Sequence, residues 1–371
     1  MEREVFAGRL NRLRSLLDER HIDAFLVAVP ENRYYLSGYG AGDLQLTESS
    51  GYLLITHSKQ CLITDFRYQE EAENEAGGFQ VLILDDGLSR VLSQLFSEFA
   101  VERVGVESHH LTFSKYREVE EALRKAQSAA SLVPIEDLVE QIRMVKEPEE
   151  IDKIRSSLAL TEKVLVGVWE NLRPGRTEKE IAWEIERTIR EAGAEAVSFP
   201  PIVAGGPNAA LPHAVPTDRS IVTGDSVVLD VGARLGHYCS DMTRTWFAGV
   251  PGPKLQEIYR VVRDAQLAAM DFIRAGRDTA EVDGVARRLI AGEGYGDHFG
   301  HGLGHGVGLA VHEKPGLRKQ KSMILQENMV VTIEPGIYLR GYGGVRLEEM
   351  VRITEKGCEL LNRQSLYYDW R

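Results

Sequence analysis

The spacing of hydrophobic residues in the first third of the chain changes between helical and extended patterns. Leu10, Leu13, Leu16 and Leu17 recur at helical spacing between charged residues, which predicts a helix over residues 2–20. Short apolar runs predict strands at 24–29, 51–56, 61–64, 81–84 and 104–106, and helical patterns lie at 88–99 and 114–126. Strands that alternate with helices predict a smaller α/β domain over residues 1–133.

A charged segment that contains proline marks a boundary, and we expect a linker over residues 134–150. Pro148 suits the first turn of a new helix. The pattern Thr177-Glu-Lys-Glu180 is a capping box, and the helix that it opens is expected to stop at Gly193. Two more helices are predicted over 253–274 and 279–293, with strand pairs between the helices. Residues 151–371 are therefore expected to form a larger α+β domain.

Composition and charge exclude several classes of protein. The 371 residues include 44 Lys and Arg against 56 Asp and Glu, a formal charge of −12, which argues against a nucleic-acid or anionic membrane surface. The first thirty residues carry charges throughout and the chain has no 18-residue apolar run, so we expect neither a signal peptide nor a membrane span. Three widely spaced cysteines form no metal or disulfide pattern, which favours a reducing cytoplasm.

Histidine and glycine gather in the last third of the chain. Six of the ten histidines lie at or beyond residue 213, and residues 300–308 alternate glycine with other side chains. Glycine at this density permits close backbone approach and positive φ. A glycine-rich run can also cradle phosphate, but this one lacks the P-loop pattern and does not join a strand to a dinucleotide-type helix. The segment is thus a candidate for chemistry other than phosphate binding.

Two aspartates occupy apolar strands that are expected to pair. Asp230 lies in Ser226–Gly232, and Asp241 lies in the return segment Tyr238–Thr245. If Leu235-Gly236 forms a two-residue turn, Asp230 faces Asp241 directly. Like charges opposed across a hairpin are destabilising, and a buried carboxylate pair needs a shared proton or a cation.

A second predicted hairpin repeats this arrangement near the end of the chain. Glu334 lies in one apolar strand and Glu348 in its return strand. Four carboxylates and one histidine are too few for two separate closed sites, but they suffice for two cations that share bridging carboxylates. Oxygen-rich ligands with one nitrogen favour Mn²⁺, Co²⁺, Fe²⁺ or Zn²⁺. Two such cations generate a bridging hydroxide and polarise a carbonyl, so the pattern indicates amide hydrolysis.

At these positions the sequence resembles the metallopeptidases of the pita-bread fold, and within them the Xaa-Pro peptidases prolidase and aminopeptidase P. The resemblance covers about residues 150–371, and the first 130 or so resemble the creatinase-type N-terminal domain more loosely. Its motifs occur in family order: Leu229-Asp230-Val-Gly, Ser240-Asp241-Met-Thr-Arg-Thr, Gly-His305-Gly-Val-Gly, His312-Glu-Lys-Pro, Thr-Ile-Glu334-Pro-Gly and Val-Arg346-Leu-Glu348.

The resemblance implies metal roles for five residues. Asp230 would be a terminal ligand, and Asp241 and Glu348 would bridge two divalent ions in each subunit. His305 and Glu334 would complete the shell of the second ion. Mn²⁺ is the expected ion, with Co²⁺, Zn²⁺ or Fe²⁺ as alternatives.

It also implies catalytic roles. Glu334 would act as the general base that takes the proton of the bridging water. His213 would shuttle protons, and His301 and His312 would orient the substrate and stabilise the oxyanion. Arg346 shares a strand face with Glu348 and would support the site, and Tyr338 matches a position behind the ligands. The expected substrates are small peptides with proline in second position, and a homodimer is expected.

Three questions stay open at this point. Dipeptidase and aminopeptidase P share every motif quoted above, so the sequence does not choose between them. A creatinase-type hydrolase would use this fold without a metal, although all five ligand positions are filled here. A non-catalytic pita-bread module that binds a partner is the third alternative. His237 and His298 belong to no motif and are expected to be structural or surface residues.

Overall fold

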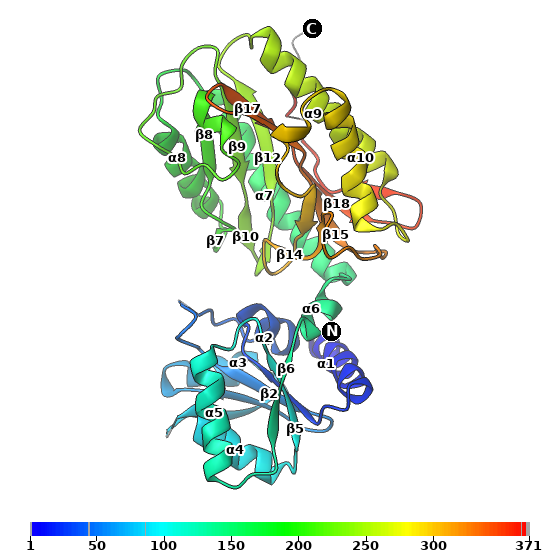
Figure 1. Cartoon of the computed structure of the whole chain (residues 1–371). Helices are drawn as coiled ribbons and strands as arrows, with labels where there is room; N and C mark the ends of the chain where they lie inside the picture. Colours follow the sequence, from blue (N-terminus) through cyan, green and yellow to red (C-terminus); the bar gives the residue numbers. More distant parts are fainter. Residues whose placement is uncertain (1, 44, 86, 365, 369–371) are drawn as a thin grey trace. The chain divides into compact units, whose positions relative to one another are not determined.

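A computed structural model describes residues 2–43, 45–85, 87–364 and 366–368 of the chain. The chain divides into two compact units, Met1–Arg143 and Met144–Arg371 (Figure 1). Residues 134–150, expected as a linker, contain the end of strand β6, the short helix α6 and the first turn of helix α7. Among the described helices, none is both long enough and apolar enough to cross a membrane.

The N-terminal unit is built on a six-stranded mixed sheet with the order β4-β3-β2-β1-β5-β6. The strands predicted at 51–56 and 61–64 are confirmed as β2 and β3, which pair antiparallel, whereas β1, β5 and β6 run parallel. The strands are β1 (Ala24–Val27), β2 (Tyr52–Thr56), β3 (Gln60–Thr64), β4 (Gln80–Ile83), β5 (Arg103–Glu107) and β6 (Ser131–Ile135).

Helices cover this sheet and confirm its α/β character. Leu92 and Phe96 of α4 and Val119 of α5 pack in one core cluster with Leu26 and Val104 of the sheet. Burial of these large side chains stabilises the unit by about 1.5–3 kcal/mol each. The helices are α1 (Glu2–Glu19), α2 (Pro30–Ser37), α3 (Gln69–Glu75), α4 (Leu88–Glu98), α5 (Phe113–Lys125) and α6 (Leu138–Arg143), with the 3₁₀ turn η1 (Phe66–Tyr68).

The C-terminal unit contains two helix pairs, and the sequence marks where they begin. Pro148 opens α7, and Thr177 and Glu180 exchange hydrogen bonds of 2.8 and 3.2 Å at the start of α8, so the capping box is confirmed. Gly193 follows the end of α8 with φ +98°. The helices are α7 (Pro148–Asn171), α8 (Glu178–Glu191), α9 (Pro253–Phe272) and α10 (Thr279–Gly292), with the 3₁₀ turns η2 (Gly206–Ala210) and η3 (Gly296–His298).

The strands of this unit form small sheets against which the helices pack. Figure 1 shows α9 and α10 side by side, and their residues Val262, Ala265 and Val282 share a core cluster with Val331 and Val351 of the C-terminal sheet. Sheets run β11-β10-β7, β12-β9-β8, β14-β13-β15-β18-β19 and β16-β17.

The strand bounds show two long hairpins that are each interrupted once. The strands are β7 (Ala196–Val197), β8 (Ile202–Gly205), β9 (Ser226–Val231), β10 (Ala233–Leu235), β11 (Tyr238–Cys239), β12 (Met242–Phe247), β13 (Gly304–Gly306), β14 (Glu313–Leu317), β15 (Val330–Ile333), β16 (Gly336–Leu339), β17 (Gly343–Arg346), β18 (Glu349–Ile353) and β19 (Cys358–Leu360).

Candidate active site

The first hairpin carries Asp230 and Asp241 in a register that differs from the prediction. Leu235 pairs with Tyr238, so the turn is Gly236-His237, with φ of +57° and +67°, and not Leu235-Gly236. Asp230 therefore lies opposite Thr243, and the expected direct pairing of the two aspartates is wrong. The shift of two positions keeps both carboxylates on one face of the hairpin, because side chains alternate with a period of two.

The ladder of this hairpin breaks at Gly232, beside Asp241. A Cβ atom on Gly232 would lie 2.1 Å from the carbonyl oxygen of Ser240, so only glycine allows the strands to approach here. Asp241 lies between β11 and β12 and is buried. The interruption frees Asp241 from regular strand pairing while the register continues on both sides.

The second hairpin is interrupted at the two glutamates. Ile333 pairs with Glu349 on one side of the gap and Gly336 pairs with Arg346 on the other. Both ladders keep one register, which sets Glu334 opposite Glu348. The backbone N–H of Glu348 donates instead to the carbonyl of Thr243, at 3.1 Å, and so joins the two hairpins at the site.

The glycine-rich segment reaches the site through close backbone approach. A Cβ atom on Gly304 would lie 2.0 Å from the carbonyl oxygen of Thr332, and one on Gly306 would lie 2.3 Å from that of Lys314. Positive φ is not the reason for these two glycines. They allow β13 to fit between β14 and β15, which brings His305 to the carboxylates.

Four of the five predicted ligands converge on one point. Ligand atoms of Asp241, His305 and Glu348 all lie within 4.8 Å of one another. His305 Nε2 lies 3.6 Å from Asp241 Oδ2 and 3.4 Å from Glu334 Oε1. Burial and the neighbouring carboxylates raise the pKa of Asp241 and Glu348 well above the usual range, and burial raises the pKa of Glu334 to about 8. Without a cation, Glu334 therefore retains a proton at neutral pH, and the raised pKa values of Asp241 and Glu348 favour their protonated forms.

His305 is neutral and directed toward these acids. Burial and the nearby His312 lower its pKa to about 4. Its Nδ1 lies 3.1 Å from the carbonyl oxygen of Gly306, which can only accept, so the proton is on Nδ1. The Nε2 lone pair then points toward Asp241 and Glu334, as a metal-binding imidazole requires.

Asp230, the fifth predicted ligand, has one oxygen occupied and one free. Arg346 Nη2 donates to Asp230 Oδ2 at 2.6 Å. In the described part of the chain, the buried Oδ1 has no hydrogen-bond partner. A buried acceptor without a donor is costly, and a cation beside it would remove that cost.

Two threonines that the sequence analysis missed support the carboxylates. Thr243 Oγ1 accepts from Arg346 Nε at 3.1 Å and donates to Glu348 Oε2 at 2.8 Å. Thr332 Oγ1 accepts from the N–H of His305 and donates to Glu334 Oε1 at 3.3 Å. Each threonine lies two residues from an acidic residue of the site, so the shared strand face was the signal that could have identified them.

His301 uses both of its ring nitrogens inside the protein. Nδ1 donates to the carbonyl of Gly302 at 2.8 Å, and burial, followed by the Arg346 charge, lowers its pKa to about 4. Its Nε2 therefore accepts, and the Tyr338 hydroxyl donates to it at 2.8 Å. Tyr338 in turn accepts from Arg346 Nη1 at 3.0 Å. The predicted residues His301 and Arg346 are thus linked through Tyr338.

The remaining predicted histidines border the same region. The rings of His305 and His312 lie 4.3 Å apart, edge to face. His213 is exposed, and its charge contributes to the lowered pKa of both His301 and His312, so the three lie near one another. Behind His312, the buried Lys146 Nζ lies 2.5 Å from Glu313 Oε1, which fixes the start of β14. Sequence reasoning also missed this ion pair.

Comparison with known proteins agrees with this geometry. Residues 152–355 match metallopeptidase family M24, and residues 9–145 match the creatinase/prolidase N-terminal domain. The chain is 35% identical to the Xaa-Pro dipeptidase of Pyrococcus furiosus over 356 residues, which cover 96% of this chain and 97% of that protein.

Solved structures share the whole fold. The Xaa-Pro dipeptidase from Bacillus anthracis superposes with a TM-score of 0.91 at 36% identity and covers 98% of this chain and 99% of its own. The X-Pro aminopeptidase from Thermotoga maritima gives a TM-score of 0.82 at 38% identity and covers 93% and 97%. The predicted fold class, a pita-bread domain preceded by a creatinase-like domain, is confirmed.

Proposed function

The chain belongs to metallopeptidase family M24, and from this premise we propose that it hydrolyses Xaa-Pro peptide bonds with two divalent metal ions. The convergence of Asp241, His305 and Glu348 within 4.8 Å carries the proposal. The names of its relatives support proline in second position, and they include both a dipeptidase and an aminopeptidase.

The residues present fit a pair of cations. The free Oδ1 of Asp230, the raised pKa values of three neighbouring carboxylic acids and the neutral His305 each favour positive charge at this point. Asp230, Asp241 and Glu348 would hold one ion, and Asp241, Glu348, His305 and Glu334 the other. Oxygen ligands with one imidazole favour Mn²⁺, with Co²⁺, Zn²⁺ or Fe²⁺ as alternatives.

When bound, the ions supply a hydroxide nucleophile near neutral pH and polarise the scissile carbonyl. Glu334 would act as general base, because its carboxylate lies 3.4 Å from His305 Nε2 and so beside the position of the nucleophile. Thr332 holds the Glu334 carboxylate by donating to Oε1.

The histidines bind the substrate and the developing charge. The ring of His312 lies beside His305 and can donate to an oxyanion on that side of the cluster. His213 lies exposed at the rim, where it can contact the peptide and transfer a proton to the leaving proline nitrogen. His301 contributes through Tyr338 and Arg346, because its own nitrogens are occupied.

Proline explains why a dedicated enzyme is needed. An Xaa-Pro bond is a tertiary amide with no N–H and a fixed φ, so peptidases that bind an extended backbone through that N–H bind it poorly. A homodimer and a cytoplasmic location complete the proposal, and light scattering of the purified protein tests the first.

The test is an assay with an Xaa-Pro dipeptide, the matching Xaa-Pro tripeptide and an Xaa-Ala dipeptide, each with Mn²⁺ and with chelator. We expect turnover of proline substrates in Mn²⁺ only. A preference for the dipeptide indicates prolidase, and turnover of the tripeptide indicates aminopeptidase P. Metal-loaded protein that is inactive on both proline substrates contradicts the proposal, and turnover in chelator supports a metal-independent hydrolase instead.

A further inference from the structure

A buried carboxylate in the first turn of α8 holds together the two ends of the loop that carries His213, residues 205–217. Glu178 is fully buried, and in the described part of the chain its carboxylate accepts hydrogen bonds from both ends of that loop. At one end, Gly205 N donates to Oε1 at 2.8 Å and Asn208 Nδ2 lies 3.1 Å from both oxygens. At the other end, Thr217 donates to Oε2 through its N–H at 2.9 Å and its hydroxyl at 2.6 Å.

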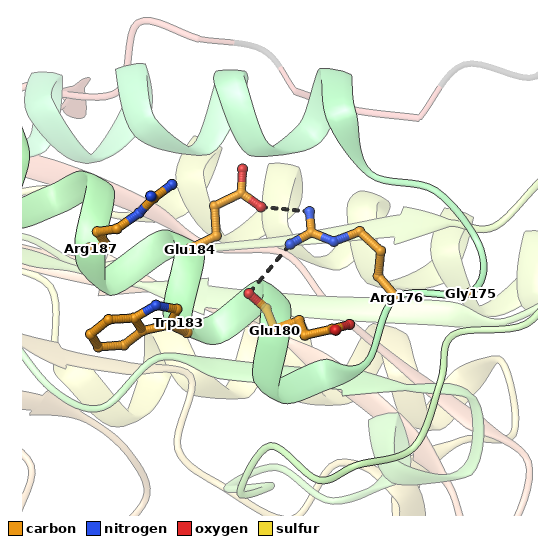
Figure 2. Close-up of a pocket in the computed structure, with 6 residues that line it drawn as sticks. All are labelled: Gly175, Arg176, Glu180, Trp183, Glu184 and Arg187. Carbon is orange, nitrogen blue, oxygen red and sulfur yellow. Dashed lines mark hydrogen bonds and ion pairs between the residues drawn. The ribbon is translucent and has the colours of Figure 1, made fainter.

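The start of α8 is itself firmly held. The capping box of Thr177 and Glu180 lies directly around Glu178. Figure 2 shows Arg176 reaching back over the helix, where it pairs with Glu184 at 2.5 Å and donates to the carbonyl of Glu180. These residues and Trp183 line an open pocket on this surface, and Glu178 is not among them. The backbone that carries Glu178 is therefore held in place, so its side chain can fix the loop ends.

The tip of the loop has much less support than its base. His213 is exposed, and Leu211 and Val215, two residues away on either side, are 56% and 79% exposed, so Ala214 is the one residue from 213 to 215 that packs in a core cluster. Arg346 Nη1 donates to the carbonyl of Pro212 at 3.1 Å and ties the tip to the site. The position of His213 thus depends on how well the loop ends are held.

We propose that Glu178 is a positioning residue that acts through His213. The inference rests on the proposed function, in which His213 contacts the substrate. Displacement of a catalytic group by about 1 Å can cost roughly 100-fold in rate, even when the mutation is distant from the chemistry.

The hydrogen bonds from the two loop ends require a carboxylate at position 178. Both oxygens of Glu178 face N–H or O–H groups, and an ionised carboxylate can accept from all of them because it carries no hydrogen of its own. Glu178→Gln keeps the size and shape of the side chain nearly unchanged. Its amide group, however, places two N–H donors against Asn208 Nδ2 or the Thr217 N–H, so bonds at one loop end are lost.

The test is a double-mutant cycle of Glu178→Gln and His213→Ala, with kcat/KM measured on an Xaa-Pro dipeptide at saturating Mn²⁺. We expect Glu178→Gln alone to lower kcat/KM by about 10- to 100-fold. In the His213→Ala background, the same change is expected to cost less than about twofold, since residues that act as a unit are not additive. Equal losses in both backgrounds would overturn the proposal.

A matched control separates positioning from general loss of a buried carboxylate. Glu162 is also buried, and its Oε1 accepts from the N–H groups of Arg363 and Gln364 at 2.7 and 3.0 Å, outside the His213 loop. Glu162→Gln is expected to leave kcat/KM within about twofold. A loss as large as that of Glu178→Gln would assign the effect to stability and contradict the proposal.

Hydrogen exchange tests whether Glu178 holds the loop ends without an activity assay. The amides of Gly205 and Thr217 are expected to exchange at least about tenfold faster in Glu178→Gln, with the bound metal unchanged. Exchange that is unchanged in Glu178→Gln would show that Glu178 does not hold the loop ends together. If the wild-type protein is inactive and exchange is still faster in Glu178→Gln, only the proposed function is overturned. If Glu178→Gln does not fold, Asn208→Ala takes its place in the same cycle, because it removes the bonds of that amide to Glu178 and Thr217 and leaves the Glu178 carboxylate in place.

Discussion

Glu334 and Glu348 lie opposite each other at the gap between two ladders that share one antiparallel register. The charge of Glu334 is one of the causes of the raised pKa of Glu348, because it repels a negative charge there. Directly opposed carboxylates are destabilising in a hairpin. The metal-free protein therefore holds a repulsive cluster in place, which a cation would relieve.

Glu348→Gln should stabilise the metal-free protein while it weakens metal binding. The amide keeps the bond from Thr243 through its oxygen and removes one negative charge. At pH 9, above the pKa of about 8 of Glu334, a gain of about 1 kcal/mol corresponds to a rise of roughly 2–4 °C in Tm. At pH 5 we expect a smaller difference, because the raised pKa of Glu348 favours its protonated form as the pH falls. Thermal unfolding in chelator at both pH values measures this.

The adjacent Glu349 supplies the control, since its carboxylate has the opposite role. It pairs with the fully buried Arg244 at 2.9 Å. Glu349→Gln leaves that guanidinium without its partner and is expected to destabilise the protein by about 3–5 kcal/mol. A Glu348→Gln protein that is destabilised like Glu349→Gln at pH 9 would contradict the repulsive cluster.

Metal binding should release protons at neutral pH. The pKa of Glu334 is about 8 in the folded protein against 4.5 as its ordinary value, so between these values the folded state holds a proton that the unfolded state has lost. The stability of the metal-free protein then falls as pH rises through this window and levels off above about pH 8. Because ligands must be deprotonated, metal affinity rises over the same window.

Calorimetric titration of Mn²⁺ into chelated protein, in buffers of different ionisation enthalpy, counts these protons. At pH 7 we expect net release of at least one proton for each protein, and less at pH 9. Release that is zero at pH 7 would mean that the carboxylates are already ionised without metal.

Thr243→Val should weaken metal binding by about 10-fold or more, because groups that orient a ligand from behind typically contribute this much. The variant loses the hydroxyl that donates to Glu348 and keeps the shape of the side chain. Thr245→Val is the matched control on the same strand, since among the described residues the Thr245 hydroxyl bonds only to the backbone of Arg346. Equal metal affinities of Thr243→Val and Thr245→Val would contradict a role of Thr243 in orienting the metal ligand Glu348.

Tyr338→Phe should lower kcat/KM about 10-fold with the metal content unchanged. It leaves His301 Nε2 as a buried acceptor without a donor, which costs about 1–3 kcal/mol. Tyr259→Phe is the control, because it removes a buried hydroxyl that accepts from the N–H of Tyr368 and not one that contacts His301 or Arg346. If Tyr338→Phe is as active as Tyr259→Phe, the chain from His301 to Arg346 has no role in turnover.

The sequence predicted most elements because local signals mark them. Pro148 and Thr177 set helix starts, and apolar runs mark the strands. The error lay in the register of the first hairpin, because Gly236 and His237 together take the positive φ values that the turn needs. Histidine is an uncommon residue in such a turn, so Leu235-Gly236 was the natural expectation.

The candidate ligands were predictable, but their supports were not. Acids in apolar strands stand out in a sequence, whereas Thr243 and Thr332 are ordinary strand residues until their partners are known. Glu178 was equally hidden, since a glutamate in a first helical turn is normally a solvated cap. Only the folded chain brings the loop around His213 back to this carboxylate.

Titration of Mn²⁺ into chelated protein tests two-metal hydrolysis most directly when turnover of an Xaa-Pro dipeptide and bound metal are measured together, with Asp241→Asn in parallel. We predict that activity appears as bound metal approaches two ions for each chain, and that Asp241→Asn loses both binding and turnover. Turnover that is full in the absence of bound metal, or that survives in Asp241→Asn, would contradict it.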